Sequence, residues 1–194
     1  MDVTSTGTSS SLIDRVKADE VGAWDRLVSL YAPLVHHWCR RWKLQDDDLA
    51  DVFQEVFKTV ILHIGEFRRD RKGDTFRGWL RTITRNKVLD HFRKHQREVE
   101  GGSEANWRFS QLAAPEDPGS DPEEAAEMHR LFLRGLEQIR GEFEERTWKA
   151  FWRTAIDGGA PQDVASELSM TPGAVRVAKS RVLQRLREEL GDPQ

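Results

Sequence analysis

The chain has 194 residues, of which 38% are hydrophobic and 32% are charged, the balance of a globular protein. At about 150 residues per domain, this length allows one domain or two small ones. No apolar run reaches the ~20 residues of a membrane span, and the N-terminus lacks the basic and apolar regions of a signal peptide, so we predict a cytoplasmic protein with no membrane partner. The single cysteine, Cys39, excludes an internal disulfide and every paired-cysteine zinc or redox site.

The formal net charge is −3, which alone argues against a nucleic-acid binder, but the charges are unevenly distributed. Residues 68–97 carry 11 basic and three acidic side chains, and residues 175–187 carry five basic side chains and no acidic one. Between these segments, residues 101–128 carry one basic and seven acidic side chains. Two basic segments separated by an acidic one indicate that nucleic acid is a candidate partner after all.

Apolar residues recur at spacings of three and four along most of the chain, which predicts helices. The first such pattern runs from Trp24 to Trp42, and the second follows the candidate N-caps Asp46–Asp48 and ends near Ile64. A third pattern begins at Phe76 and continues to about Arg97. No segment shows the sustained alternation of a strand, so we predict an all-α protein.

Composition divides the chain into two helical parts. Residues 1–11 are rich in Ser, Thr and Gly and are predicted to form a disordered tail. Gly and Pro punctuate the acidic residues 98–122, which are predicted to form a flexible linker. The sequence therefore predicts two small helical domains, residues 12–97 and residues 123–190, joined by an acidic linker.

The second domain contains a predicted helix-turn-helix. Residues 162–168 form its short first helix, and Thr171 begins the second, since Thr is a good N-cap and the proline that follows it needs no N–H partner. Ser169 stands in the turn, where a left-handed glycine is usual. In this motif the second helix enters the major groove of DNA; an ordinary helical hairpin with a solvated basic face is the alternative.

Four runs in residues 48–94 resemble region two of the extracytoplasmic-function (ECF) sigma factors of bacterial RNA polymerase. They are DLADVFQEVF (48–57), IGEF (64–67), FRGWL (76–80) and RNKVLDHFR (85–93). The helix-turn-helix is similar to region four of the same family, and the two motif sets occur in the family's order and spacing, from about residue 12 to residue 190. The chain departs from the family pattern at Ile61, where Trp is frequent, and at AVRVAK (174–179), which concerns the promoter sequence read rather than the fold.

The resemblance implies a sigma factor that is not an enzyme and needs no cofactor. Such a protein binds core RNA polymerase and directs promoter recognition and opening, with region two at the minus-10 element and region four at the minus-35 element. An anti-sigma factor is a further candidate partner. Two other functions remain as alternatives: a helix-turn-helix transcriptional regulator, which would leave residues 48–94 unexplained, and a sigma mimic that titrates an anti-sigma factor without initiating.

Site residues follow from the resemblance position by position. By that resemblance, the helix with D-x-x-Q-E-V-F docks on the clamp coiled coil of the largest catalytic polymerase subunit, and residues 68–75 correspond to the loop that captures an unpaired base. The polymerase-binding residues implied are Asp51, Gln54 and Glu55; a solvated acidic face is the alternative. The minus-10 residues implied are Arg81, Arg85, Asn86, Lys87, Arg93 and Lys94. The minus-35 residues implied are Thr171, Arg176, Lys179, Ser180 and Arg181.

Two further features have competing interpretations. The acidic linker, with Trp107, is either a nucleic-acid mimic in a basic polymerase channel or a solvated spacer. The cluster of His36, His37 and Cys39 suggests a metal site, but His37 and Cys39 are two residues apart and point to different faces of a helix. We therefore predict no metal site and a core position for Cys39.

Overall fold

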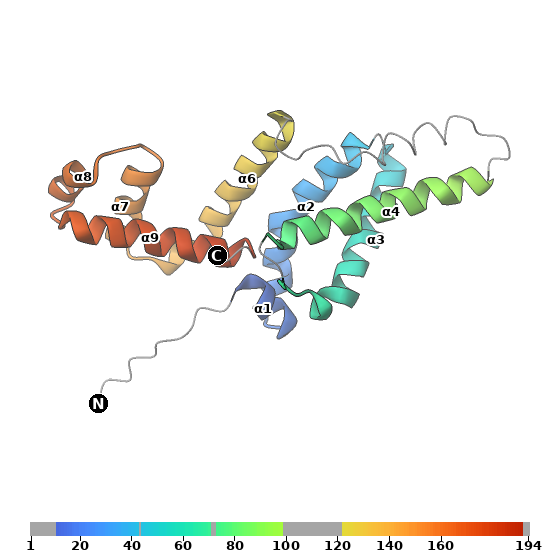
Figure 1. Cartoon of the computed structure of the whole chain (residues 1–194), viewed down its shortest axis with the longest axis horizontal. Helices are drawn as coiled ribbons and strands as arrows, with labels where there is room; N and C mark the ends of the chain where they lie inside the picture. The colour runs from blue at the N-terminus through green and yellow to red at the C-terminus, as the bar shows by residue number, and fades with distance from the viewer. Residues whose placement is uncertain (1–10, 43, 71–72, 99–121, 192–194) are drawn as a thin grey trace. The chain divides into compact units, whose positions relative to one another are not determined.

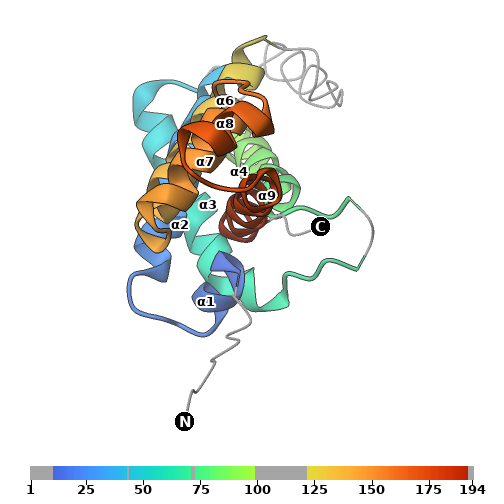
Figure 2. The same ribbon diagram turned by 90° about the vertical axis from the view of Figure 1, so that its left-hand side faces the viewer.

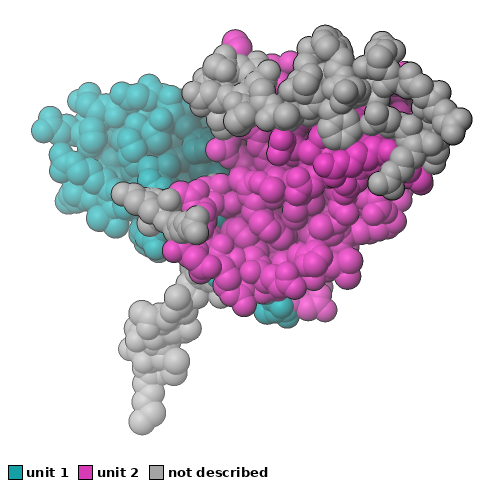
Figure 3. Space-filling model, turned by 45° about the vertical axis from the view of Figure 1, so that its right-hand side comes forward, with its two compact units in different colours: residues 1–18, 132–194 teal, residues 19–131 magenta. Residues whose placement is uncertain are grey.

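The computed structural model describes residues 11–42, 44–70, 73–98 and 122–191 (Figure 1). These residues form eight α-helices and two 3₁₀ helices and contain no strand, so the predicted all-α class is confirmed. Within them, no helix is both long and apolar enough to cross a membrane. The predicted tail and linker, with Trp107, lie almost entirely outside the described residues. The chain divides into two compact units, residues 19–131 and residues 1–18 with 132–194, which Figure 3 colours separately.

Three long helices form most of the unit of residues 19–131. They are α2 (Ala23–Arg41), α3 (Asp46–His63) and α4 (Phe76–Glu98), which pack side by side (Figure 1 and Figure 2). The 3₁₀ helix η1 (Ile64–Glu66) extends α3. The apolar spacing explains this packing, because most of the periodic residues of each helix are buried, among them Leu27, Tyr31, Trp38, Val52, Val56, Phe76 and Leu80. Val28 of α2 and Ile61 of α3, which the spacing also placed on the apolar faces, are exposed instead. Cys39 lies in this core, as expected, and burial raises the pKa of its thiol to about 12.

The other unit is built on α9 (Pro172–Glu189), on which α1 (Leu12–Lys17), α7 (Glu145–Ala155) and α8 (Pro161–Glu167) pack. Its core contains Leu136 and Ile139 of α6 (Pro122–Ile139) and, from α7 and α9, Trp148, Phe151, Val182 and Leu186. The 3₁₀ helix η2 (Arg140–Glu142) follows α6. Gly135 lets α6 approach α9, since a Cβ there would lie 2.8 Å from a methyl carbon of Leu186. The boundary between the two units falls within α6.

Helices α8 and α9 form the predicted helix-turn-helix. Val164 and Ala165 of α8 pack against Val175 and Ala178 of α9. The expected cap is present: the Thr171 hydroxyl accepts a hydrogen bond from the N–H of Ala174 at 3.1 Å, and Pro172 is the first residue of α9. These contacts set the start of α9 relative to α8.

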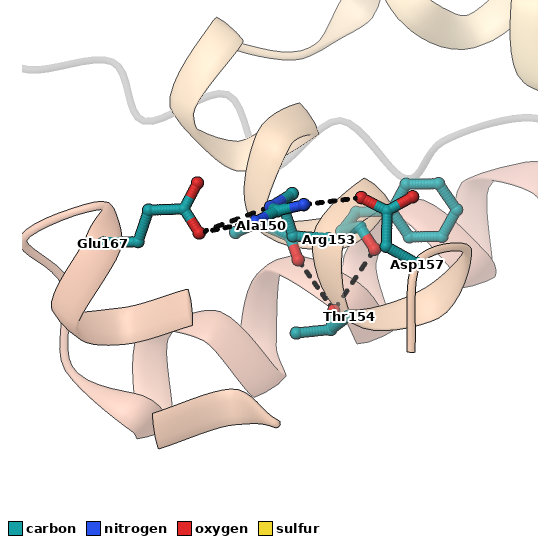
Figure 4. A network of polar contacts seen from close by, with 6 residues as sticks. Ala150, Arg153, Thr154, Asp157 and Glu167 are labelled. Carbon is teal, nitrogen blue, oxygen red and sulfur yellow. Dashed lines mark hydrogen bonds and ion pairs between the residues drawn. The ribbon is translucent and has the colours of Figure 1, made fainter. Parts of the chain in front are cut away.

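Two arginines of α7 hold the helix-turn-helix from the side. Arg146 donates hydrogen bonds to the carbonyl oxygens of Leu168 and Ser169, the residues that end α8 and begin the turn. Figure 4 shows Arg153 between Glu167 of α8 and Asp157, with a 3.0 Å ion pair to each carboxylate. The hydrogen bond with Glu167 is the main reason that the pKa of Arg153 is raised. Both arginines therefore tie the end of α8 and the start of the turn to α7.

Ser169 adopts the left-handed conformation, with φ of 51°, that its place in the turn predicts. A residue with a Cβ is strained there, whereas glycine is not. We therefore predict that Ser169→Gly raises the free energy of unfolding by about 1 kcal/mol, measured by urea denaturation of the full chain. As the control, Ser180→Gly on the exposed face of α9 should lower it by about the same amount, because glycine weakens a helix interior. A loss of stability with Ser169→Gly would contradict this account of the turn.

Candidate polymerase and nucleic-acid interface

The outer face of α3 presents acidic and amide groups. Asp51, Gln54 and Glu55 are all exposed and lie on the side of the helix opposite the buried Val52 and Val56. A residue turns an α-helix by 100°, so these three side chains fall within about 100° of one another. The Lys58 ammonium lies 2.7 Å from the Glu55 carboxylate, and this hydrogen bond is the main cause that lowers the pKa of Glu55. The face therefore presents two carboxylates, of which that of Glu55 is already paired with Lys58.

The six predicted minus-10 residues on α4 do not share one face. Around the helix axis they form three pairs, and the two side chains of each pair lie within about 40° of each other. The pairs are Arg81 with Arg85, Asn86 with Arg93, and Lys87 with Lys94. Asn86, Arg93 and Lys94 are exposed, whereas Arg81, Arg85 and Lys87 are partly buried. Arg93 also forms a 3.2 Å ion pair with Asp90 on its own helix.

Arg81 is held by a buried carboxylate. Its guanidinium lies 3.0 Å from Glu124 in the first turn of α6, and Arg41 at the end of α2 lies 3.5 Å from the other oxygen of the same carboxylate. The Glu124 side chain is only 2% exposed. Beside it, Arg77 contacts the sulfur of Met128 at 3.2 Å. All of these residues belong to the unit of residues 19–131, so the start of α6 covers part of the basic surface of α4.

A hollow of about 480 Å³ lies where the segment after α3 meets the first turns of α4. Residues of the loop 68–75 line it together with Glu66, Phe67, Gly78, Trp79 and Thr82. Phe76 is fully buried, as its spacing predicts, and Phe92 is partly buried. Trp79 is also partly buried: it packs on Phe67 and Phe76 and reaches the hollow as well. Part of an aromatic ring therefore forms a wall of this hollow.

Helix α9 presents its basic residues on two sides. Arg176, Lys179 and Ser180 fall within about 100° of one another, whereas Arg181 lies further round the helix. Arg176, Ser180 and Arg181 are exposed and Lys179 is partly buried. The hydroxyl of Thr171 is used in capping the helix.

Sequence reasoning missed two features of α9. Val177 is 57% exposed. Around the axis of α9 it lies between Ser180 and Arg181 on the outer face. In the sequence it is visible as an apolar residue that interrupts the basic pattern. Arg185 is engaged by Glu142 at 2.6 Å and by the buried Glu189 at 2.8 Å. Burial alone would lower the pKa of Arg185, but the hydrogen bonds and charges of these two carboxylates outweigh it and raise the pKa.

In the segment with His36, His37 and Cys39, the predicted core position of Cys39 is confirmed, whereas His36 is exposed. Within the described part of the chain, one group of side chains brings together atoms that could hold a metal ion, and it consists of Asp48, His91 and His95. Neither spacing nor composition pointed to this group, since Asp48 lies on α3 and both histidines lie on α4.

Comparison with known proteins identifies relatives along most of the chain. The family model of sigma-70 region 2 matches residues 27–98. The RNA polymerase sigma factor CarQ of Myxococcus xanthus is 28% identical over 181 residues, covering 93% of this chain and 96% of CarQ. The ECF RNA polymerase sigma factor SigD of Mycobacterium tuberculosis is 30% identical over 191 residues, covering 92% of this chain and 84% of SigD. The ECF RNA polymerase sigma factor SigE of Mycolicibacterium smegmatis is 28% identical over 177 residues, covering 87% of this chain and 62% of SigE.

Proposed function

The chain belongs to the ECF sigma factors of the sigma-70 family, which act in transcription initiation, and we propose that it directs core RNA polymerase to promoters in three steps. Helix α3 binds the polymerase, α4 and the loop 68–75 open the minus-10 element, and α9 reads the minus-35 element. The observation that carries the proposal is the presence in one chain of the region-two helices α2–α4 and a helix-turn-helix with exposed cations. A regulator acting through α9 alone would need no α2–α4.

The charge of α3 supports polymerase binding. Two carboxylates one helical turn apart, Asp51 and Glu55, can pair with arginines of a partner in charge-assisted hydrogen bonds. Neither side chain contributes to the core, so this face is available for binding without a cost to the fold.

The hollow beside α4 supports base capture. An unpaired base requires an apolar or aromatic wall and polar groups at its edge, and opening the duplex requires cations for the backbone phosphates. Trp79 supplies an aromatic wall, and Thr75 and Thr82 supply hydroxyl groups. Arg85, Lys87 and Lys94 are the cations proposed for the phosphates, and Asn86 is proposed to contact a base edge.

The outer face of α9 supports recognition of the minus-35 element in the major groove. Guanidinium groups pair with guanine edges, and apolar groups contact the methyl group of thymine. Arg176 and Arg181 supply guanidinium groups, and Val177 supplies an apolar group. We propose that no step of this function is catalytic.

The first prediction concerns α3. The double variant Asp51→Lys with Glu55→Lys should weaken binding to core polymerase about tenfold or more, because like charges then face the partner's arginines. A pull-down titration of core polymerase with the full chain measures this, and circular dichroism checks that the helix content is kept. Glu137→Lys with Glu145→Lys, which makes the same charge change on exposed residues of the other unit, should bind as the original chain does. Unchanged affinity of the α3 variant would reject this face as the docking site.

A second prediction separates readers from phosphate contacts on α9. Alanine at a residue that contacts a base edge should cost about 1–3 kcal/mol and relax specificity at one base pair, whereas alanine at a phosphate contact should weaken all sequences alike. We predict the first pattern for Arg176 and the second for Lys179, measured with holoenzyme on a library of randomised upstream elements. Arg187→Ala in the last turn of α9 is the control and should change neither the affinity for DNA nor the sequence specificity. If alanine at Arg176, Lys179 and Arg181 together leaves specificity intact, α9 is not the reader.

A third prediction concerns the cover over Arg81. Glu124→Gln removes the buried charge that holds Arg81 while keeping the shape of the side chain, so Arg81 becomes available for a phosphate. The free chain should then bind single-stranded DNA more tightly at low salt, and the log–log dependence of affinity on salt should steepen by ~0.7. Glu137→Gln, the same change at an exposed position of α6, should have no such effect. An unchanged salt dependence in Glu124→Gln would mean that Arg81 does not reach DNA.

A further inference from the structure

Asp48, in the first turn of α3, and His91 and His95, one turn apart on α4, converge on a single point. The Nε2 atom of His91 lies 3.5 Å from the Oδ1 atom of Asp48, and the Nε2 atom of His95 lies 3.9 Å from the same oxygen. The two imidazole rings are 4.4 Å apart between centroids. One ligand atom from each of the three residues lies within 4.8 Å of the other two. We propose that these three residues form a binding site for a divalent transition metal such as Zn²⁺.

The distances leave room for an ion between the three side chains. Both nitrogen-to-oxygen separations exceed the 2.7–3.2 Å typical of a hydrogen bond, so the carboxylate lies at ion-pair distance from the two rings without a hydrogen bond to either. A tetrahedral zinc ion with bonds of about 2.0–2.1 Å places its ligand atoms roughly 3.3 Å apart. Small rotations of the three side chains would bring them to this spacing around an ion.

The side chains have the freedom to make these rotations. His95 is 53% exposed and Asp48 is 36% exposed, so both can turn without disturbing the core, whereas His91 is 13% exposed and supplies a more fixed ligand. The open side leaves a coordination position to water. The site is therefore a partly exposed, three-residue site rather than a closed structural one.

The ligand types select the class of metal. Two imidazole nitrogens and one carboxylate oxygen suit Zn²⁺, Cu²⁺, Ni²⁺ and Fe²⁺, whereas Mg²⁺ and Ca²⁺ prefer oxygen ligands alone. Two histidines at positions i and i+4 of a helix point from the same face. His91 and His95 therefore provide two ligands from one face of α4, and Asp48 adds the third ligand from the neighbouring helix α3.

A bound ion would cross-link two functional helices. Asp48 precedes Asp51 by one turn on α3, and His91 and His95 bracket Arg93 and Lys94 on α4. The ion would therefore join the beginning of the proposed polymerase-binding helix to the last turns of the proposed minus-10 helix. Since α4 continues only to Glu98, the chief structural effect expected is stabilisation of these last turns.

Isothermal titration of the metal-free full chain with ZnCl₂ tests the proposal. We expect one Zn²⁺ per chain, and a thermal unfolding midpoint that rises with Zn²⁺ concentration because only the folded chain presents the site. MgCl₂ should cause neither effect. Asp48→Asn and His91→Ala should each weaken Zn²⁺ binding by at least the ~10–100-fold that loss of an outer-shell partner costs in metal sites. His129→Ala, which removes an exposed histidine of α6, is the matched control and should bind Zn²⁺ as the original chain does.

A second measurement guards against variants that misfold. Cobalt(II) absorption reports the ligands directly, and the visible bands of the original chain should weaken in His95→Ala while its circular dichroism spectrum keeps the helix content. Zinc binding that Asp48→Asn and His91→Ala both retain would overturn the proposal, as would the absence of any zinc binding by the original chain. Stability that depends on pH through Asp48 but does not respond to zinc would identify an ion pair between the carboxylate and protonated histidines and would also overturn it.

Discussion

Glu124 is the most deeply buried charged residue in the described part of the unit of residues 19–131. A charge removed from water is stable only when other charges or hydrogen bonds replace the water. Arg81 and Arg41 supply that replacement, at 3.0 and 3.5 Å, and in doing so they connect the first turn of α6 to both α2 and α4. The packing of α6 and the availability of a basic residue on α4 are therefore two consequences of one contact.

This constraint changes how the basic residues of the chain are interpreted. A high local density of arginine suggests a uniform surface for DNA, but several of these side chains stabilise the fold instead. Arg185 neutralises the buried Glu189 and pairs with Glu142, while Arg146 and Arg153 hold the helix-turn-helix from α7. The cations best placed for nucleic acid are the exposed Lys94 of α4 and the exposed Arg176 and Arg181 of α9.

Local patterns in the sequence predicted much of the fold. The three- and four-residue spacing identified the core residues of α2, α3 and α4, and the Thr–Pro pair identified the start of α9, because both signals depend on neighbours within one helix. The pairing of Arg81 with Glu124, that of Arg185 with Glu142, and the meeting of Asp48 with His91 could not be found in this way. In each case the residues come from helices distant in the sequence, and such a pairing leaves no periodic pattern. The functional assignments to α3, α4 and α9 came from the family's motifs rather than from these patterns.

The central claim is that this chain makes core RNA polymerase initiate at specific promoters. Transcription of a fragmented genomic library by core polymerase, with and without the full chain and with sequencing of the RNA 5′ ends, tests it most directly. The account predicts new start sites that appear only with the chain and that share two upstream elements at a fixed separation. If the chain instead binds specific duplex DNA by itself and yields no new start sites, it is a regulator or a mimic, and the account is wrong.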